Sequence, residues 1–215
     1  MATYTNYVKN PRVFTDLAGV SGSGVTRVTN DGVTGATCID FSSSTNYSAA
    51  SYSNDAIPLP PPGTIWVTFA AKLVSGPSNY ALYQHFRTSS WAVTGTNVSR
   101  GAFTPTSSWQ RFTYSFDPAA PADAAYLKLD FMKTVATAAV LRVTDVMVTT
   151  ANVAYFDGST SGGTWSGTPH ASTSTWSDSP ASTIPLKVKI GGALVSVVGY
   201  KAKVGGSLVD VRITT

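Results

Sequence analysis

Apolar and polar residues alternate with a period of two along most of this 215-residue chain. Residues 64–73 carry an apolar side chain at every second position, and residues 126–132 repeat the pattern. This spacing places alternate side chains on opposite faces of an extended strand. In residues 139–148 it places Leu141, Val143 and Met147 on one face. The pattern therefore predicts an all-β fold.

Short segments rich in proline and glycine separate the alternating runs, for example residues 58–63, 75–79 and 117–121. Such segments interrupt strands and form turns. About eight strands at this spacing favour an antiparallel β-sandwich, or jelly roll. The expected strands are residues 25–29, 36–41, 46–50, 64–73, 80–86, 109–116, 126–132 and 139–148.

The C-terminal residues repeat one strand–turn–strand pattern. Residues 186–197 are followed, fourteen positions later, by residues 200–211, and each copy has Gly-Gly at its centre. Glycine adopts the positive φ that tight hairpin turns require. Two hairpins are too small to bury a core of their own, so we expect an assembly or attachment element. Its assigned residues are Lys187, Lys189, Gly191, Gly192, Lys201, Lys203, Gly205 and Gly206.

These patterns divide the chain into three expected parts. Residues 1–156 form a jelly-roll sandwich, residues 157–185 a Gly/Ser/Thr-rich linker, and residues 186–215 the C-terminal double β-hairpin extension. Residues 1–185 carry ten basic and ten acidic side chains, whereas residues 186–215 carry five basic and one acidic. The extension therefore holds all of the net positive charge.

The basic extension has two interpretations. Its lysines either attract an anionic partner, or they keep exposed strand edges from aggregating. Five charges make a small field, so we favour the second interpretation and expect no nucleic-acid partner. The first residues lack the basic and apolar regions of a signal peptide, and no apolar run reaches the length of a membrane span. We expect synthesis in a cytoplasm and no membrane insertion.

Nothing in the sequence marks a catalytic centre. There is no glutamate, and the eleven aspartates are scattered, mostly in predicted turns. The two histidines and the single cysteine, Cys38, form no recognisable triad or zinc motif. We therefore predict no enzyme activity and no cofactor. Calcium is the one ion considered, with Asp145 as its candidate ligand and residues 157–159 as a second, weaker candidate. The favoured alternative is a hydrogen-bonded aspartate at a strand edge.

Aromatic residues are the richest chemical resource of the chain: five Trp, ten Tyr and nine Phe. Exposed aromatic rings stack on sugar rings, whereas buried ones fill the core. The sequence alone does not separate these two roles. The candidate glycan-stacking residues are Tyr47, Tyr52, Tyr80, Tyr83, Trp91 and Trp109.

Several segments also carry recognisable motifs. Residues 6–14 resemble the N-x-V-x-N-P-x-F opening of carbohydrate-binding-module-like jelly rolls. Residues 155–160 and 165–174 resemble a Y-F-D-G-D-T … W-x-G-T-P-x-x-S-x-S closing stretch. Together with the Gly-Gly hairpins, these motifs are similar to minor tail proteins of phages that infect actinobacteria. One departure is Thr15, where members of that family frequently have glutamate.

The resemblance implies a non-enzymatic structural protein of the virion tail, made in the host cytoplasm. The jelly roll would be displayed outward, and the hairpins would contact other phage tail proteins or sister copies, with a trimer favoured. A second hypothesis is a receptor-binding lectin that recognises host cell-wall polysaccharide. A wall-degrading hydrolase is the least favoured.

Overall fold

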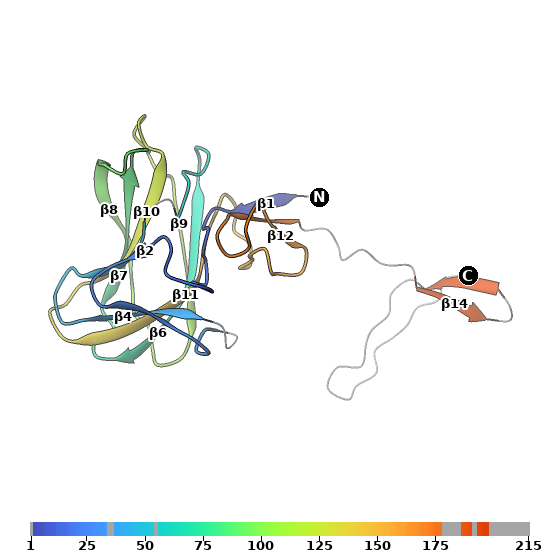
Figure 1. Ribbon diagram of the computed structural model, residues 1–215, viewed down its shortest axis with the longest axis horizontal. Helices are drawn as coiled ribbons and strands as arrows, with labels where there is room; N and C mark the ends of the chain where they lie inside the picture. Colours follow the sequence, from blue (N-terminus) through green and yellow to red (C-terminus); the bar gives the residue numbers. More distant parts are fainter. Residues whose placement is uncertain (1, 34–36, 54–55, 178–185, 191–192, 198–215) are drawn as a thin grey trace. The chain divides into compact units, whose positions relative to one another are not determined.

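The computed structural model describes residues 2–33, 37–53, 56–177, 186–190 and 193–197. The chain divides into a body, residues 2–177, and a second unit made chiefly of residues 178–215. Every regular element assigned in the described residues is a β-strand (Figure 1). None of these residues belongs to a helix long and apolar enough to cross a membrane.

Two five-stranded antiparallel sheets form the sandwich of the body, which confirms the predicted fold class. The first sheet has the order β2 (Val20–Ser21), β5 (Ala49–Tyr52), β10 (Tyr126–Lys133), β7 (Tyr80–Arg87) and β8 (Val93–Phe103). The second has the order β3 (Val25–Val28), β4 (Cys38–Ser43), β11 (Ala139–Thr149), β6 (Ile65–Ser75) and β9 (Gln110–Phe116).

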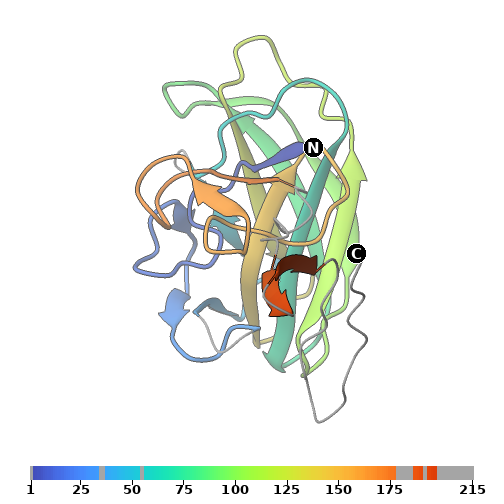
Figure 2. The same ribbon diagram turned by 90° about the vertical axis from the view of Figure 1, so that its right-hand side faces the viewer.

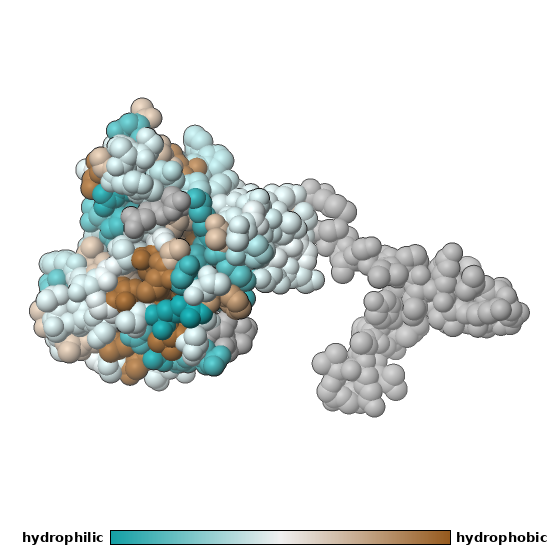
Figure 3. Space-filling model, viewed as in Figure 1, coloured by the Kyte–Doolittle hydropathy of each residue, from teal (hydrophilic) through white to brown (hydrophobic). Residues whose placement is uncertain are grey.

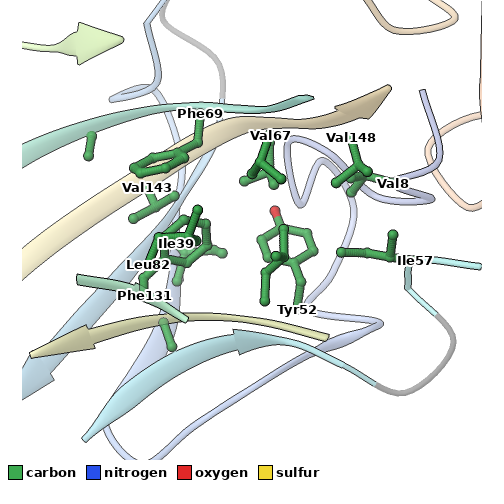
Figure 4. Packing of buried hydrophobic residues seen from close by; sticks show 14 of the residues in the cluster. Val8, Ile39, Tyr52, Ile57, Val67, Phe69, Leu82, Phe131, Val143 and Val148 are labelled. Atoms are coloured by element: carbon green, nitrogen blue, oxygen red, sulfur yellow. The ribbon is translucent and has the colours of Figure 1, made fainter. Parts of the chain in front are cut away.

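Aromatic rings from both sheets interlock in the core. Phe69 of β6 lies 5.1 Å from Phe103 and 4.7 Å from Phe131, which both belong to the first sheet. Phe69 also stacks on Phe112 of its neighbour β9. In Figure 4, Tyr52 points from the first sheet toward Val67. Because apolar side chains turn inward, Figure 3 shows hydrophobic surface only in patches between hydrophilic residues.

A β-bulge in β11 changes which residues face the core. The register with β6 shifts between Thr144 and Met147, and Asp145 within this interval has a φ of 53°. The extra residue reverses the alternation. Val146 and Val148 therefore join the core cluster, and Met147, which the sequence pattern places beside Leu141 and Val143, does not belong to it.

Strand β8 is the longest strand that the sequence pattern misses. Its residues are largely exposed, since it is an edge strand, and its register with β7 shifts twice. Gly95 and Gly101 both have positive φ. A Cβ at Gly101 would lie 2.5 Å from the Tyr114 ring, so only glycine fits without displacing that ring. Bulges and exposure together remove the period-two pattern.

A third sheet corrects the predicted linker. Its order is β1 (Thr3–Asn6), β13 (Ser174–Ser177) and β12 (Gly163–Trp165), and Figure 2 shows the dark-blue β1 beside the orange strands. Residues 157–177 therefore belong to the body, and the boundary lies after Ser177, not at residue 156. The polar composition of this segment concealed strands that pair with the N-terminus.

The two terminal motifs of the body contact each other. The Asn6 side-chain amide donates to the Phe156 carbonyl oxygen at 3.1 Å. Its Oδ1 accepts from the backbone amides of Val8 and Val148. Asn6 is fully buried, so these bonds satisfy a side chain that would be costly to bury unpaired. The opening and closing motifs are thus held together by hydrogen bonds of one buried side chain.

In the second unit, β14 (Leu186–Ile190) pairs antiparallel with β15 (Ala193–Val197). The register sets Lys187 opposite Ser196 and Lys189 opposite Leu194. This confirms the strand pairing of the first predicted hairpin. Its central Gly191 and Gly192, and the second copy with its lysines and glycines, lie outside the described residues.

We expect Phe69→Ala to lower the free energy of unfolding by about 3–5 kcal/mol, because it leaves a cavity where the two sheets meet. Urea unfolding followed by circular dichroism measures this change. Val74→Ala is the matched control, since Val74 lies on the same strand and is 47% exposed. Equal losses in the two variants would contradict the core assignment.

Candidate functional site

The first sheet presents a polar outer face on β7 and β10. Leu127, Leu129 and Phe131 of β10 point into the core. The residues between them therefore point outward. In the register, Tyr126 pairs with Arg87, Lys128 with His85, and Asp130 with Tyr83. We call these six residues the outer face.

An ion network ties the middle of the outer face together. Asp130 is buried, and its Oδ2 lies 2.6 Å from His85 Nε2. Lys128 Nζ lies 2.8 Å from Asp130 Oδ1. Burial alone raises the pKa of Asp130, but contacts with His85 and Lys128 outweigh burial, and the pKa falls below its ordinary value of 3.8. Asp130 therefore carries a negative charge that compensates Lys128.

A stacked aromatic pair stands at one end of the outer face. Trp91 and Tyr126 have ring centroids 4.4 Å apart and an interplanar angle of 16°. Trp91 lies in the β7–β8 loop with a φ of 68°. Its amide donates to the Thr88 carbonyl oxygen at 3.0 Å, and its own carbonyl oxygen accepts from Arg87 Nη1 at 3.1 Å. These bonds hold a strained residue in place, which is common at ligand sites.

A hollow of about 210 Å³ opens beside this pair. Its lining residues are Ser21, Ser53, Arg87, Trp91 and Lys128. The hydroxyls of Ser21 and Ser53 lie 2.8 Å apart. The hollow thus combines an aromatic wall, two hydroxyls and two cationic side chains, which is the mixture of apolar surface and few polar groups that binds small ring-shaped ligands.

A larger hollow, of about 390 Å³, lies where β4 and β6 end and β11 begins. Its lining consists of serine, threonine, alanine and valine. It offers hydroxyls but neither an aromatic ring nor a charge. Because sugar recognition combines stacking with hydrogen bonding, the hollow beside Trp91 is the better candidate site.

Two of the predicted stacking residues are wrong, because the structure buries them in the core. Tyr52 is fully buried, and its hydroxyl donates to the Asn10 carbonyl oxygen at 3.3 Å. Tyr80 is 1% exposed and stacks on Phe103 at 5.6 Å. Burial raises the pKa of Tyr80 to about 12. Both side chains point from their strands into the core, so no ligand ring reaches them.

The other four candidates lie at the surface in different places. Tyr83 and Trp91 belong to the outer face and its hollow. Tyr47 is 67% exposed in the β4–β5 connection. Trp109 precedes β9 and packs under Lys72 of the second sheet, whose Nζ lies 5.3 Å from the ring centroid. Of these four residues, only Tyr83 lies on the outer face and only Trp91 lines the hollow beside it.

Asp145 does not fit the role of a calcium ligand. Its Oδ1 lies 2.8 Å from Arg12 Nε, and its Oδ2 lies 2.9 Å from Arg111 Nη2. Both oxygens thus already contact cations, which would repel a calcium ion. The Tyr155 ring lies 5.1 Å from the Arg12 guanidinium and 5.0 Å from that of Arg111. Within the described parts of the chain, no group of three or more His, Cys, Asp or Glu could hold a metal.

Sequence reasoning missed Tyr126, Arg87 and Lys128 as site residues. Tyr126 and Lys128 sit at alternate positions between core leucines, so the period of β10 could have marked them as outward-facing. Arg87 is the last residue of β7 and lies four positions after Tyr83, so the two side chains point to the same face of the sheet. Their meeting across β7 and β10 depends on strand order, which the alternation does not encode.

Comparisons with known proteins concern the fold. No protein-family model matches the sequence. No curated protein matches it either. The structure is similar to an arabinose-bound GH51 α-L-arabinofuranosidase, with 11% identity, a TM-score of 0.51, and coverage of 67% of this chain and 26% of that chain.

A second similar structure contains the CBM22-1 and GH10 modules of Clostridium thermocellum endo-1,4-β-D-xylanase 10B with xylohexaose. Identity is 14%, the TM-score is 0.50, and coverage is 68% of this chain and 28% of that chain. The CBM22-1 xylan-binding domain from Paenibacillus barcinonensis aligns over 67% of this chain and 90% of its own, with 14% identity and a TM-score of 0.49. Several of the similar structures are carbohydrate-binding modules, and at these identities the likeness is one of fold alone.

We expect the stability of the protein to fall with pH below about 4, partly through Asp130. A carboxyl whose pKa is lowered by folding stabilises the protein above its unfolded pKa, and this contribution disappears as pH falls through the folded pKa. Asp130→Asn should therefore show a shallower loss of unfolding free energy across this window. Urea unfolding at a series of pH values measures the slopes, and identical slopes would contradict the role of the network.

Proposed function

We propose that the body binds polysaccharide, without catalysis, on the outer face of the first sheet. The observation that carries this proposal is the Trp91–Tyr126 pair beside the hollow. A sugar ring would stack on the exposed part of this pair, since its C–H groups are slightly positive and aromatic faces are negative. Ser21, Ser53 and the cations would contact the sugar's oxygen atoms. The shared fold is compatible with this role, because one similar structure was solved with xylohexaose.

Non-catalytic binding also agrees with the chemistry of the acidic residues near the site. Glycoside hydrolysis uses two carboxyl groups that face each other across the scissile bond. Here the carboxylate of the outer face, Asp130, is occupied by His85 and Lys128. Asp123, on the neighbouring loop, accepts from the Thr94 hydroxyl at 2.7 Å. Neither carboxylate lines the hollow.

Trp91→Ala should weaken polysaccharide binding roughly tenfold, since the loss of an aromatic stacking partner costs about 0.5–1.5 kcal/mol beyond buried area. Affinity gel electrophoresis with a panel of soluble plant and bacterial polysaccharides measures the retardation. Trp109→Ala is the matched control, because this indole packs beneath Lys72 and away from the hollow. Equal weakening in both variants, or no retardation of the wild type by any polysaccharide, would contradict the proposal.

We further propose that the repeated hairpins attach this binding domain to a larger particle, the tail of a phage. The specific observation in favour is the β14–β15 pair, because a two-stranded hairpin is marginal in isolation and leaves edges for a partner. In this arrangement the chain is a minor tail protein, its partners are other tail proteins and sister copies, and its ligand is host cell-wall polysaccharide. Closed threefold symmetry would satisfy the same edges on every copy.

Purified virions are expected to contain this chain in a multiple of three copies per particle. Quantitative mass spectrometry, calibrated against a major tail protein of known copy number, gives that value. Its absence from purified particles would contradict the tail location, and a copy number not divisible by three would contradict the trimer.

A further inference from the structure

We propose that the hollow beside Trp91 recognises an anionic saccharide, one whose sugar ring carries a carboxylate or phosphate group. This inference rests on the proposed polysaccharide-binding function and specifies its ligand class. The feature that carries it is Arg87, a cationic residue that lines the hollow.

Three of the five other arginines described in the body pair with carboxylates, and Arg87 does not. Arg12 and Arg111 pair with Asp145, and Arg142 pairs with Asp31 and Asp40. Arg27 and Arg100 satisfy their guanidiniums with backbone carbonyls or the Gln84 side chain. Among the described residues, the Arg87 side chain contacts no carboxylate, and its one hydrogen bond goes to the Trp91 carbonyl oxygen. The remaining N–H groups of its guanidinium are available to a ligand.

The charges around Arg87 leave a local positive excess. Lys128, the other cation of the hollow, is compensated by Asp130. His85 lies against that same carboxylate, and Asp123, which accepts from the neutral Thr94 hydroxyl, does not line the hollow. No acidic residue lines the hollow. The excess is local, because residues 1–185 contain equal numbers of basic and acidic side chains.

The geometry suits one anionic group next to a sugar ring. A guanidinium binds a carboxylate or a phosphate through two parallel hydrogen bonds, and these are stronger than bonds to neutral groups. Arg87 donates to the Trp91 carbonyl oxygen, and both residues line the hollow. A ring stacked on Trp91 would thus bring its charged substituent to Arg87, with Ser21 and Ser53 available for hydroxyls.

The test compares three probes: polygalacturonate for carboxylates, poly(glycerol phosphate) for phosphates, and unsubstituted xylan as the neutral saccharide. Isothermal titration calorimetry with the full chain should show at least tenfold tighter binding to one anionic probe than to xylan. Arg87→Gln should reduce the anionic binding at least tenfold and xylan binding far less, because a neutral sugar loses a hydrogen bond to this side chain but no charge pairing. Arg87→Lys keeps the positive charge but lacks the planar pair of N–H donors, so it should retain part of the affinity for the anionic probe. Whichever anionic probe binds identifies the group.

Controls separate this inference from the function on which it rests. Lys9→Gln removes one positive charge outside this hollow and should leave all three affinities unchanged. Raising NaCl from 50 to 500 mM should weaken anionic binding only, because salt screens exposed charges. If xylan binds as tightly as both anionic probes, or Arg87→Gln weakens all probes equally while its melting temperature is unchanged, the anion inference fails and polysaccharide binding stands. If the wild type binds no saccharide, the proposed function itself fails.

Discussion

Leu127, Leu129 and Phe131 anchor strand β10 in the core, and this burial decides what the outer face presents. Because side chains alternate, the same strand must direct Tyr126, Lys128 and Asp130 outward. A slip of one residue in the pairing with β7 would exchange the two sets, placing charges in the core. The hydrophobic core is therefore what positions the candidate site, although no core residue takes part in it.

The terminal motifs illustrate why resemblance and function need separate arguments. Asn6 bonds the backbone at Phe156, and Arg12 lies 3.4 Å from Asp157 and 2.8 Å from Asp145. The conspicuous opening and closing segments thus join the N-terminus to residues 155–177 and stabilise the body. None of their residues lines the hollow beside Trp91, so they carry information about the fold and little about a ligand.

The fold class and most strands could be predicted from the sequence, because period-two burial is a local signal. Four features could not. The bulge at Asp145 reverses the alternation within one strand, and β8 lacks the alternation since it is an exposed, bulged edge. The separation of Tyr52 and Tyr80 in the core from Trp91 at the surface depends on which face of each strand meets the opposite sheet. Arg87 and Tyr126 meet only through strand order.

The proposed function requires that saccharides bind at the outer face of the first sheet. An amide and indole NMR titration of the full chain with xylohexaose and with an oligogalacturonate tests it most directly. We expect the largest shifts on the Trp91 indole, on residues 87–92 and on the outward positions of β10. Largest shifts at the serine-lined hollow near residues 42–45 and 138–140, or no shifts with either ligand, would contradict it.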